Sequence, residues 1–288
     1  MYTNQTEHAI ERLVGSYSVE ITAKDMPSLE KSRNILRAGM QISVPFLPGE
    51  DLAARVDAAA LVRRLGFLPM PHISARRLRS EGELEQFLAA LRDHAAIDRV
   101  FVVAGDPPRP LGPYEDALSI IRTGLLGRYG VKTVGIAGYP EGHPDIAEPV
   151  LWQALLDKKA ALADSGHEFE IVTQFAFDSA PVLSWLRQVR EHDIHVPVRI
   201  GIPGPASVKT LLRFAARCGV GASAKVMAKY GISITKLLNT AGPDELIREF
   251  AAKLDPSEHG EVLLHFYPFG GLAKTAEWVH DFALLQHA

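Results

Sequence analysis

The stretch RVFVVAGDPP, residues 99–108, indicates the fold class of this chain. Its run Val-Phe-Val-Val lacks the polar alternation of a strand with one wet face, so it predicts a strand buried on both faces. Gly105 and Asp106 end the run, and two prolines prevent a simple continuation. A buried strand that ends on a lone carboxylate raises the question of whether Asp106 serves a site or caps a turn.

Similar apolar runs recur along the chain, with amphipathic helical stretches between them. The expected strands cover residues 16–22, 40–46, 67–74, 99–105, 131–138, 168–175, 196–202 and 262–268. Helix signals include a C-cap at Gly66 and a capping box formed by Ser80 and Glu83. Eight strand–helix alternations in 288 residues predict an α/β fold of the (β/α)8 TIM-barrel type. An open doubly wound sheet is the alternative, but it usually has fewer strands, and no Gly-x-Gly-x-x-Gly follows the first strand.

No linker, low-complexity tract or charge block divides the chain. We therefore expect one domain over residues 1–288, with an N-terminal helix and extra material at residues 219–242. That extra segment would form short helices over the barrel mouth or a contact in a homo-oligomer, and its sequence does not choose between them.

Composition excludes several classes of partner. A net charge of −3 argues against nucleic acid and membrane surfaces, which normally require a basic face. The single cysteine, Cys218, excludes an internal disulfide and a Cys-based zinc cluster, and no His/Asp/Glu spacing predicts another metal site. No segment approaches the roughly 18 apolar residues of a membrane span, and the N-terminus lacks a signal-peptide pattern. These features predict a cytoplasmic protein.

Polar residues gather at the expected carboxyl ends of the strands, where barrel active sites lie. Glu20 and Asp106 are two carboxylates on different strands, and such a pair can divide acid and base roles. The plainer interpretations are that Asp106 caps the next turn and that Glu20 faces solvent on an alternating strand. His72, His143 and His265 also end strands or follow them, and each has a plain interpretation as a packed or rim histidine.

Several of these segments resemble a known family in order and spacing. VVAGDPP (102–108), AGYPEGHP (137–144) and VTQFAFD (172–178) resemble signature segments of methylenetetrahydrofolate reductases. HFYPFGG (265–271) and SVEIT (18–22) are weaker matches to that family's last and first strands. The resemblance implies a (β/α)8 barrel that reduces 5,10-methylenetetrahydrofolate to 5-methyltetrahydrofolate, a small-molecule folate substrate. In most of the family NAD(P)H first reduces a bound FAD.

The resemblance also implies roles for individual residues. Glu20 matches the general acid that opens the methylene bridge, and Asp106 matches the carboxylate that orients the pterin and acts near the flavin. Gln174 matches the amide that reads the pterin, with Phe175 beside it as a second substrate contact. The positions matched to cofactor binding are His72, Gly105, Tyr139 and His143.

Three departures from the family pattern concern the phosphates of FAD. Pro45 stands where a Thr-containing turn is usual, Ala104 replaces an Arg, and Leu162 replaces a Lys. A pyrophosphate needs cations or backbone N–H groups, so direct hydride transfer from NAD(P)H to the folate is an alternative to the flavin route.

Two other functions compete with reductase activity. A folate-binding barrel without redox activity, acting as a partner subunit or sensor, would also have lost cofactor-binding cations. A different barrel enzyme, such as an aldolase or a pterin methyltransferase, is the third interpretation. An aldolase requires a Schiff-base lysine at a strand end, and none of the eight expected strands ends on one.

Overall fold

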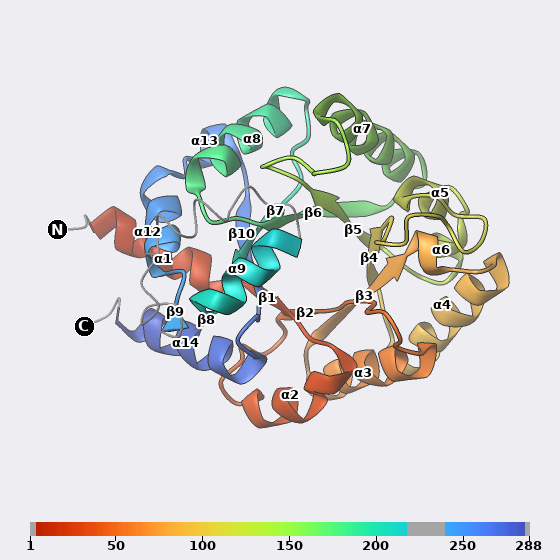
Figure 1. Cartoon of the computed structure of the whole chain (residues 1–288), viewed down its shortest axis with the longest axis horizontal. Coiled ribbons are helices and arrows are strands. Elements are labelled where there is room, and N and C mark those ends of the chain that lie inside the picture. Colours follow the sequence, from red (N-terminus) through yellow and green to blue (C-terminus); the bar gives the residue numbers. More distant parts are fainter. Residues whose placement is uncertain (1–3, 218–239, 286–288) are drawn as a thin grey trace.

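The computed structural model describes residues 4–217 and 240–285, and eight parallel strands in it close into a barrel (Figure 1). The neighbour order around the barrel is β1-β10-β7-β6-β5-β4-β3-β2. The strands are β1 (Ser18–Glu20), β2 (Gln41–Val44), β3 (Leu68–Ser74), β4 (Arg99–Val103), β5 (Thr133–Gly138), β6 (Glu168–Phe175), β7 (Val198–Pro203) and β10 (Val262–Tyr267). Each strand overlaps an expected run, and β7 extends one residue beyond its run, so the predicted (β/α)8 barrel is confirmed and the open sheet is excluded.

Helices surround the strands, and α9 lies across the middle of the view instead of in the outer ring (Figure 1). They are α1 (Asn4–Gly15), α2 (Met26–Ser32), α3 (Leu52–Arg64), α4 (Glu81–Ala95), α5 (Ala117–Ile121), α6 (Leu125–Arg128), α7 (Glu148–Asp164), α8 (Ser179–Glu191), α9 (Val208–Arg217), α12 (Asp244–Lys253), α13 (Pro256–His259) and α14 (Leu272–Leu284). Short 3-10 turns, Ala23–Asp25 and Ala75–Arg77, follow β1 and β3. Of the extra segment, residues 219–239 lie outside the described residues, and β9 (Thr240–Ala241) pairs with β8 (Ala206–Ser207).

Helix ends follow the signals in the sequence. The Ser80 hydroxyl accepts a hydrogen bond from the Glu83 backbone N–H at 3.2 Å, which fixes the start of α4. The Glu83 carboxylate accepts the backbone N–H of Arg79 rather than that of Ser80, so the reciprocal half of the box shifts by one residue. Gly66 has φ +87°, a conformation that ends α3 without a Cβ penalty.

Alternation along the strands separates two cores. Val19 and Ile42 point outward, are fully buried, and join the large apolar core between the strands and the helices. Met70, Phe101 and Val172 point inward and form a separate cluster in the lumen. Gly135 makes room for this cluster, because a Cβ there would collide with the Met70 and Phe101 side chains. The middle of the barrel is thus filled with side chains.

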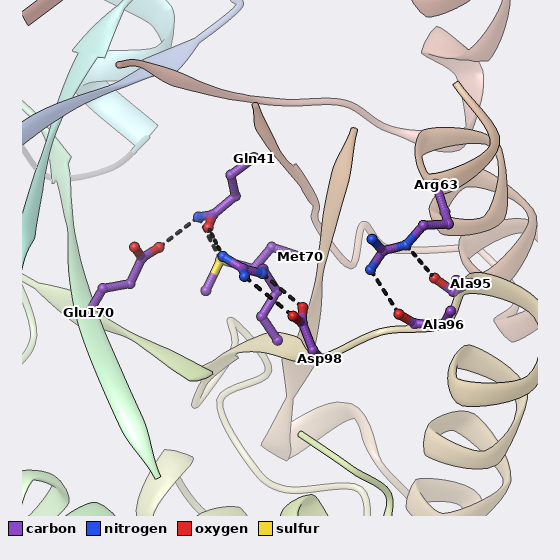
Figure 2. A network of polar contacts seen from close by, with 8 residues as sticks. Gln41, Arg63, Met70, Ala95, Ala96, Asp98 and Glu170 are labelled. Carbon is purple, nitrogen blue, oxygen red and sulfur yellow. Dashed lines mark hydrogen bonds and ion pairs between the residues drawn. The ribbon is translucent and has the colours of Figure 1, made fainter. Parts of the chain in front are cut away.

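The amino end of the barrel is closed by a polar network (Figure 2). Gln41 Nε2 donates to Glu170 Oε1 at 2.6 Å, and Arg99 Nη1 donates to Gln41 Oε1 at 3.2 Å. Arg199 Nε donates to both Glu170 oxygens, at 2.9 and 3.1 Å. Asp98 accepts from Arg99 Nε at 3.0 Å and completes the network. Because this end is packed with paired groups, access to the lumen is from the carboxyl ends of the strands.

Figure 2 also shows a contact outside the lumen, where Arg63 of α3 reaches the end of α4. Its guanidinium donates to the carbonyls of Ala95 and Ala96, at 3.0 and 2.8 Å. These carbonyls lack helical partners, so Arg63 satisfies them and ties the two helices together.

Candidate active site

The carboxyl end of β1 places Glu20 in the mouth of the barrel. Val19 and Ile21 are buried against the helices, so Glu20 between them points to the lumen side. Its side chain is 21% exposed, and Oε2 lies 4.0 Å from Nε2 of His265. The arrangement agrees with an inward-facing Glu20 rather than with a solvent-facing strand residue.

His265 joins β10 to β1 across the point where the barrel closes. Its ring is 2% exposed, and Nδ1 lies 2.9 Å from the Ser18 hydroxyl, its register partner on β1. The ring also contacts that of Tyr267 in an edge-on arrangement, with centroids 4.9 Å apart. Tyr267 in turn donates its hydroxyl to the carbonyl of Thr173 at 3.0 Å. Packing and hydrogen bonds therefore fix the orientation of the imidazole.

His72 on β3 lies in the same part of the lumen. Its ring packs on Phe101 with centroids 4.6 Å apart. Burial, with smaller contributions from the nearby His265 and Arg55, lowers the pKa of His72 to about 3. At neutral pH His72 is uncharged, and it can contact a ligand by stacking or by a neutral hydrogen bond.

Asp106 lies at the rim after β4 and forms an ion pair with Arg77, which follows β3. The carboxylate is 63% exposed, and no backbone N–H in residues 4–217 and 240–285 donates to it, unlike a turn-capping Asp. Gly105 before it has φ +93°, and a Cβ there would collide with the Ser74 hydroxyl. The tight turn at Gly105 thus presents Asp106 at the mouth, where Arg77 holds one of its two oxygens.

Gln174 and Phe175 end β6 beside an irregularity in the pairing of β6 with β7. The Gln174 amide oxygen accepts the Phe175 backbone N–H at 3.1 Å, so the side chain folds back on its own strand. Phe175 is buried in an aromatic cluster with Phe177, Tyr267 and Phe269. Helix α9 covers this cluster, and its Phe214 ring stacks on Phe269 at 4.0 Å. The structure places Phe175 in packing contacts rather than on an open wall.

Tyr139 and His143 follow β5, which is four strands from β1 in either direction around the barrel. Their rings meet edge-on at 5.4 Å. Tyr139 lines a cavity of about 320 Å³ between α7 and α8, with Trp152 and Trp185 among its walls. The structure does not bring these two residues into contact with Glu20 or His265.

The three positions that depart from the FAD-binding pattern, Pro45, Ala104 and Leu162, carry no cationic side chain. Leu162 is fully buried in the apolar core, so it points away from any ligand. The ring of Phe46, which follows Pro45, has its centroid 3.5 Å from Cζ of Arg55. The Arg55 guanidinium is therefore already packed on an aromatic ring. The pKa of Lys158, one turn before Leu162, is lowered to about 8 by burial despite the opposing effect of Asp116. These residues do not fit the phosphates of FAD in the family's manner.

Sequence patterns do not point to Ser18 or Arg77, although both contact candidate site residues. Ser18 gains its importance from the closure of β1 on β10, which joins residues 247 positions apart. Arg77 meets Asp106 through the pairing of β3 with β4. Either contact becomes visible only when the order of strands around the barrel is known.

Two further observations concern other kinds of site. Among the described residues no helix has both the length and the apolar character needed to cross a membrane. Within the same residues, no group of three or more His, Cys, Asp or Glu side chains is arranged to hold a metal ion.

The fold and the polar mouth define a TIM barrel of the class whose sites lie at the carboxyl ends of the strands. Residues 42–267 match the family model described as methylenetetrahydrofolate reductase. The chain belongs to the methylenetetrahydrofolate reductase family. The match includes Asp106, Gln174 and His265, while Glu20 precedes it.

Two relatives of similar sequence are named as members of this family. The chain is 28% identical to methylenetetrahydrofolate reductase 2 of Saccharomyces cerevisiae over 169 residues, which is 56% of this chain and 26% of the yeast protein. It is 28% identical to methylenetetrahydrofolate reductase (NADH) 1 of Arabidopsis thaliana over 218 residues, 69% of this chain and 35% of the plant protein. The chain thus spans about a third or less of the length of these relatives.

A solved structure supports the fold alone. It is an uncharacterized protein from Clostridium thermocellum that binds two copies of 5-methyl-5,6,7,8-tetrahydrofolic acid. It aligns with a TM-score of 0.63 over 99% of both chains, at 12% identity.

Proposed function

We propose that this chain reduces 5,10-methylenetetrahydrofolate to 5-methyltetrahydrofolate with NAD(P)H. The observation that carries the proposal is the inward-facing Glu20 at the barrel mouth, 4.0 Å from His265, in a chain of this family. The Arabidopsis relative, whose name specifies NADH, supports a nicotinamide as the reductant.

Glu20 would supply the proton that starts the reaction. The methylene bridge joins two nitrogens, and protonation of N10 lets the carbon–N10 bond break, with its electron pair left on N10. The carbon then forms an iminium with N5, which accepts a hydride. A carboxyl group at a partly buried mouth is suited to this step, since general acids typically contribute about 10²- to 10⁴-fold.

Asp106 and Gln174 would bind the pterin. The pterin edge offers N–H donors, and a carboxylate and an amide oxygen can accept them. Arg77 occupies one oxygen of Asp106, and the other remains able to accept from a ligand. Gln174 would release its contact with the Phe175 backbone to reach the substrate, and Phe175 would remain as the apolar floor beside it.

The hydride would pass directly from the nicotinamide to the folate. Because Pro45, Ala104 and Leu162 supply no cation for a flavin pyrophosphate, this route does not pass through FAD. His72, Gly105, Tyr139 and His143 are then candidates for contacts with the nicotinamide cofactor. Hydride transfer itself requires close stacking of donor and acceptor and exclusion of water.

The test is NAD(P)H oxidation by the purified protein with and without 5,10-methylenetetrahydrofolate. We expect oxidation that depends on the folate and forms 5-methyltetrahydrofolate, from a colourless protein without added FAD. A yellow protein that loses activity when its flavin is stripped would support the flavin route instead. Folate binding without turnover by either nicotinamide would contradict reductase activity and favour a binding protein.

A further inference from the structure

The mouth contains a histidine to which the proposed chemistry assigns no role. Building on that proposed function, we infer that His265 is a positioning residue that shares a proton with Glu20. The pair thereby keeps a proton available for transfer to the folate at neutral pH. His265 does not itself contact the substrate in this scheme.

The contacts of the imidazole support this role. Nε2 faces Glu20 Oε2 at 4.0 Å, and Nδ1 lies 2.9 Å from the Ser18 hydroxyl. That hydroxyl also lies 3.4 Å from the Leu264 carbonyl, so it can either accept from Nδ1 or donate to it. Both ring nitrogens therefore have a partner, and the one directed at the mouth faces the proposed acid.

A general acid must carry its proton at the working pH. A glutamic acid in water has a pKa of about 4.3 and is almost fully ionised at pH 7, whereas an imidazole ordinarily has a pKa of about 6.5. Glu20 Oε2 and His265 Nε2 face each other at 4.0 Å, and a proton shared between two such groups belongs to the pair rather than to one member. The imidazole can thus retain a proton that the carboxylate alone would lose.

Among the described residues, those that the structure places against His265 include no side chain with a fixed positive charge. Glu20 and Ser18 face it from β1, Tyr267 from its own strand, and His72 from the direction of β3. Its neighbour on β7 is Gly201, which has no side chain. His72 is uncharged at neutral pH, because its pKa is lowered to about 3.

The proton step balances in atoms and charge. When the two side chains close from 4.0 Å to hydrogen-bond distance, one proton passes from His265 Nε2 to the Glu20 carboxylate, and Glu20 gives a proton to N10 as the carbon–N10 bond breaks. This leaves a neutral imidazole and a carboxylate. After the product leaves, the pair takes up one proton from water through the partly exposed Glu20.

The experiment compares the pH dependence of kcat and KM in the wild type and in His265→Asn. We expect kcat at pH 7 to fall by about tenfold or more with KM for folate changed less than about twofold, since the loss concerns a proton and not binding. The alkaline limb of the kcat profile should also move to lower pH, so that the variant recovers activity as the pH falls towards 5. His259→Asn is the matched control, because His259 is equally buried but lies in α13, outside the site.

Each outcome decides between the two proposals. A wild type without folate-dependent turnover would end the proposed function and, with it, the role of His265. An active wild type with an unchanged kcat profile in His265→Asn would overturn the role of His265 alone. If His265→Asn is less stable than His259→Asn and does not fold, Ser18→Ala decides. It should move the alkaline limb in the same direction by a smaller amount, and an unmoved limb would overturn the inference.

Discussion

The two ends of the barrel lumen both contain charged side chains, but they hold them differently. At the amino end, Glu170 accepts short hydrogen bonds from Gln41 and Arg199, at 2.6 to 3.1 Å. At the carboxyl end, Glu20 Oε2 lies 4.0 Å from Nε2 of His265, which is beyond hydrogen-bond distance. A fully paired buried network is rigid and costly to disturb, whereas a loosely held acid is free to meet a ligand. The difference separates the part of the lumen that stabilises the fold from the part that binds.

The largest expected effect is on catalysis, at the loosely held end. Glu20→Gln keeps the shape of the side chain but removes the acid, so we expect folate reduction to fall by about 10²- to 10⁴-fold. The melting temperature should stay close to that of the wild type, because no short hydrogen bond is lost. Steady-state kinetics and thermal unfolding measure the two quantities. Wild-type turnover in this variant would remove Glu20 from the mechanism.

At the paired end the expected effect is on stability. Glu170→Gln removes the negative charge and leaves Arg199 buried without its ion-pair partner, which should lower the free energy of unfolding by about 3–5 kcal/mol. Urea denaturation measures the loss. Activity per folded molecule should change little, and a kcat that fell as far as in Glu20→Gln would show that the two ends are not separate.

A smaller effect is expected at the rim. Asp106→Asn retains a hydrogen-bonding side chain but loses the charge that pairs with Arg77 and would accept pterin N–H groups. We expect folate affinity to weaken by about tenfold, as is typical of one lost charge-assisted hydrogen bond, and the hydride step to slow. Titration calorimetry and single-turnover kinetics test this, and unaltered binding would assign Asp106 to holding the rim.

The effect that is smallest at neutral pH concerns the pH dependence of stability. Between about pH 3 and 6.5 the unfolded chain protonates His72 while the folded protein does not, so the wild type loses stability as the pH falls through this window. His72→Phe should remove this contribution, which is at most about 1.4 kcal/mol per pH unit. Urea titrations at several pH values compare the slopes. Equal slopes in the two proteins would show that His72 titrates normally.

Periodicity was sufficient to predict the barrel, because each strand is a short apolar run and the helices between them are capped and amphipathic. The expected strand over residues 16–22 is one of the shortest in the structure, since only Ser18–Glu20 pairs with its neighbours. Barrel closure could not be deduced residue by residue. The contact of Ser18 with His265 depends on how the first and last strands pair, which no local pattern encodes.

The candidate site was only partly predictable. Alternation places Glu20 inside the barrel because Val19 and Ile21 must be covered by helices. The surroundings of Phe175 were not predictable, because its burial depends on Phe269 and on α9, which are distant in the sequence. The position of Tyr139 around the ring likewise follows from the strand order and not from its own segment.

The filled middle of the lumen has a kinetic consequence. In the described part of the chain, Met70 and Phe101 fill the middle of the lumen and the polar network fills its amino end, so ligands would reach Glu20 from the carboxyl end. The folate and the nicotinamide would then both bind at this carboxyl end, one stacked over the other. The products would leave from the same end. Excess folate would compete with the nicotinamide for binding at this end. We therefore expect the initial rate to pass through a maximum as the folate concentration rises.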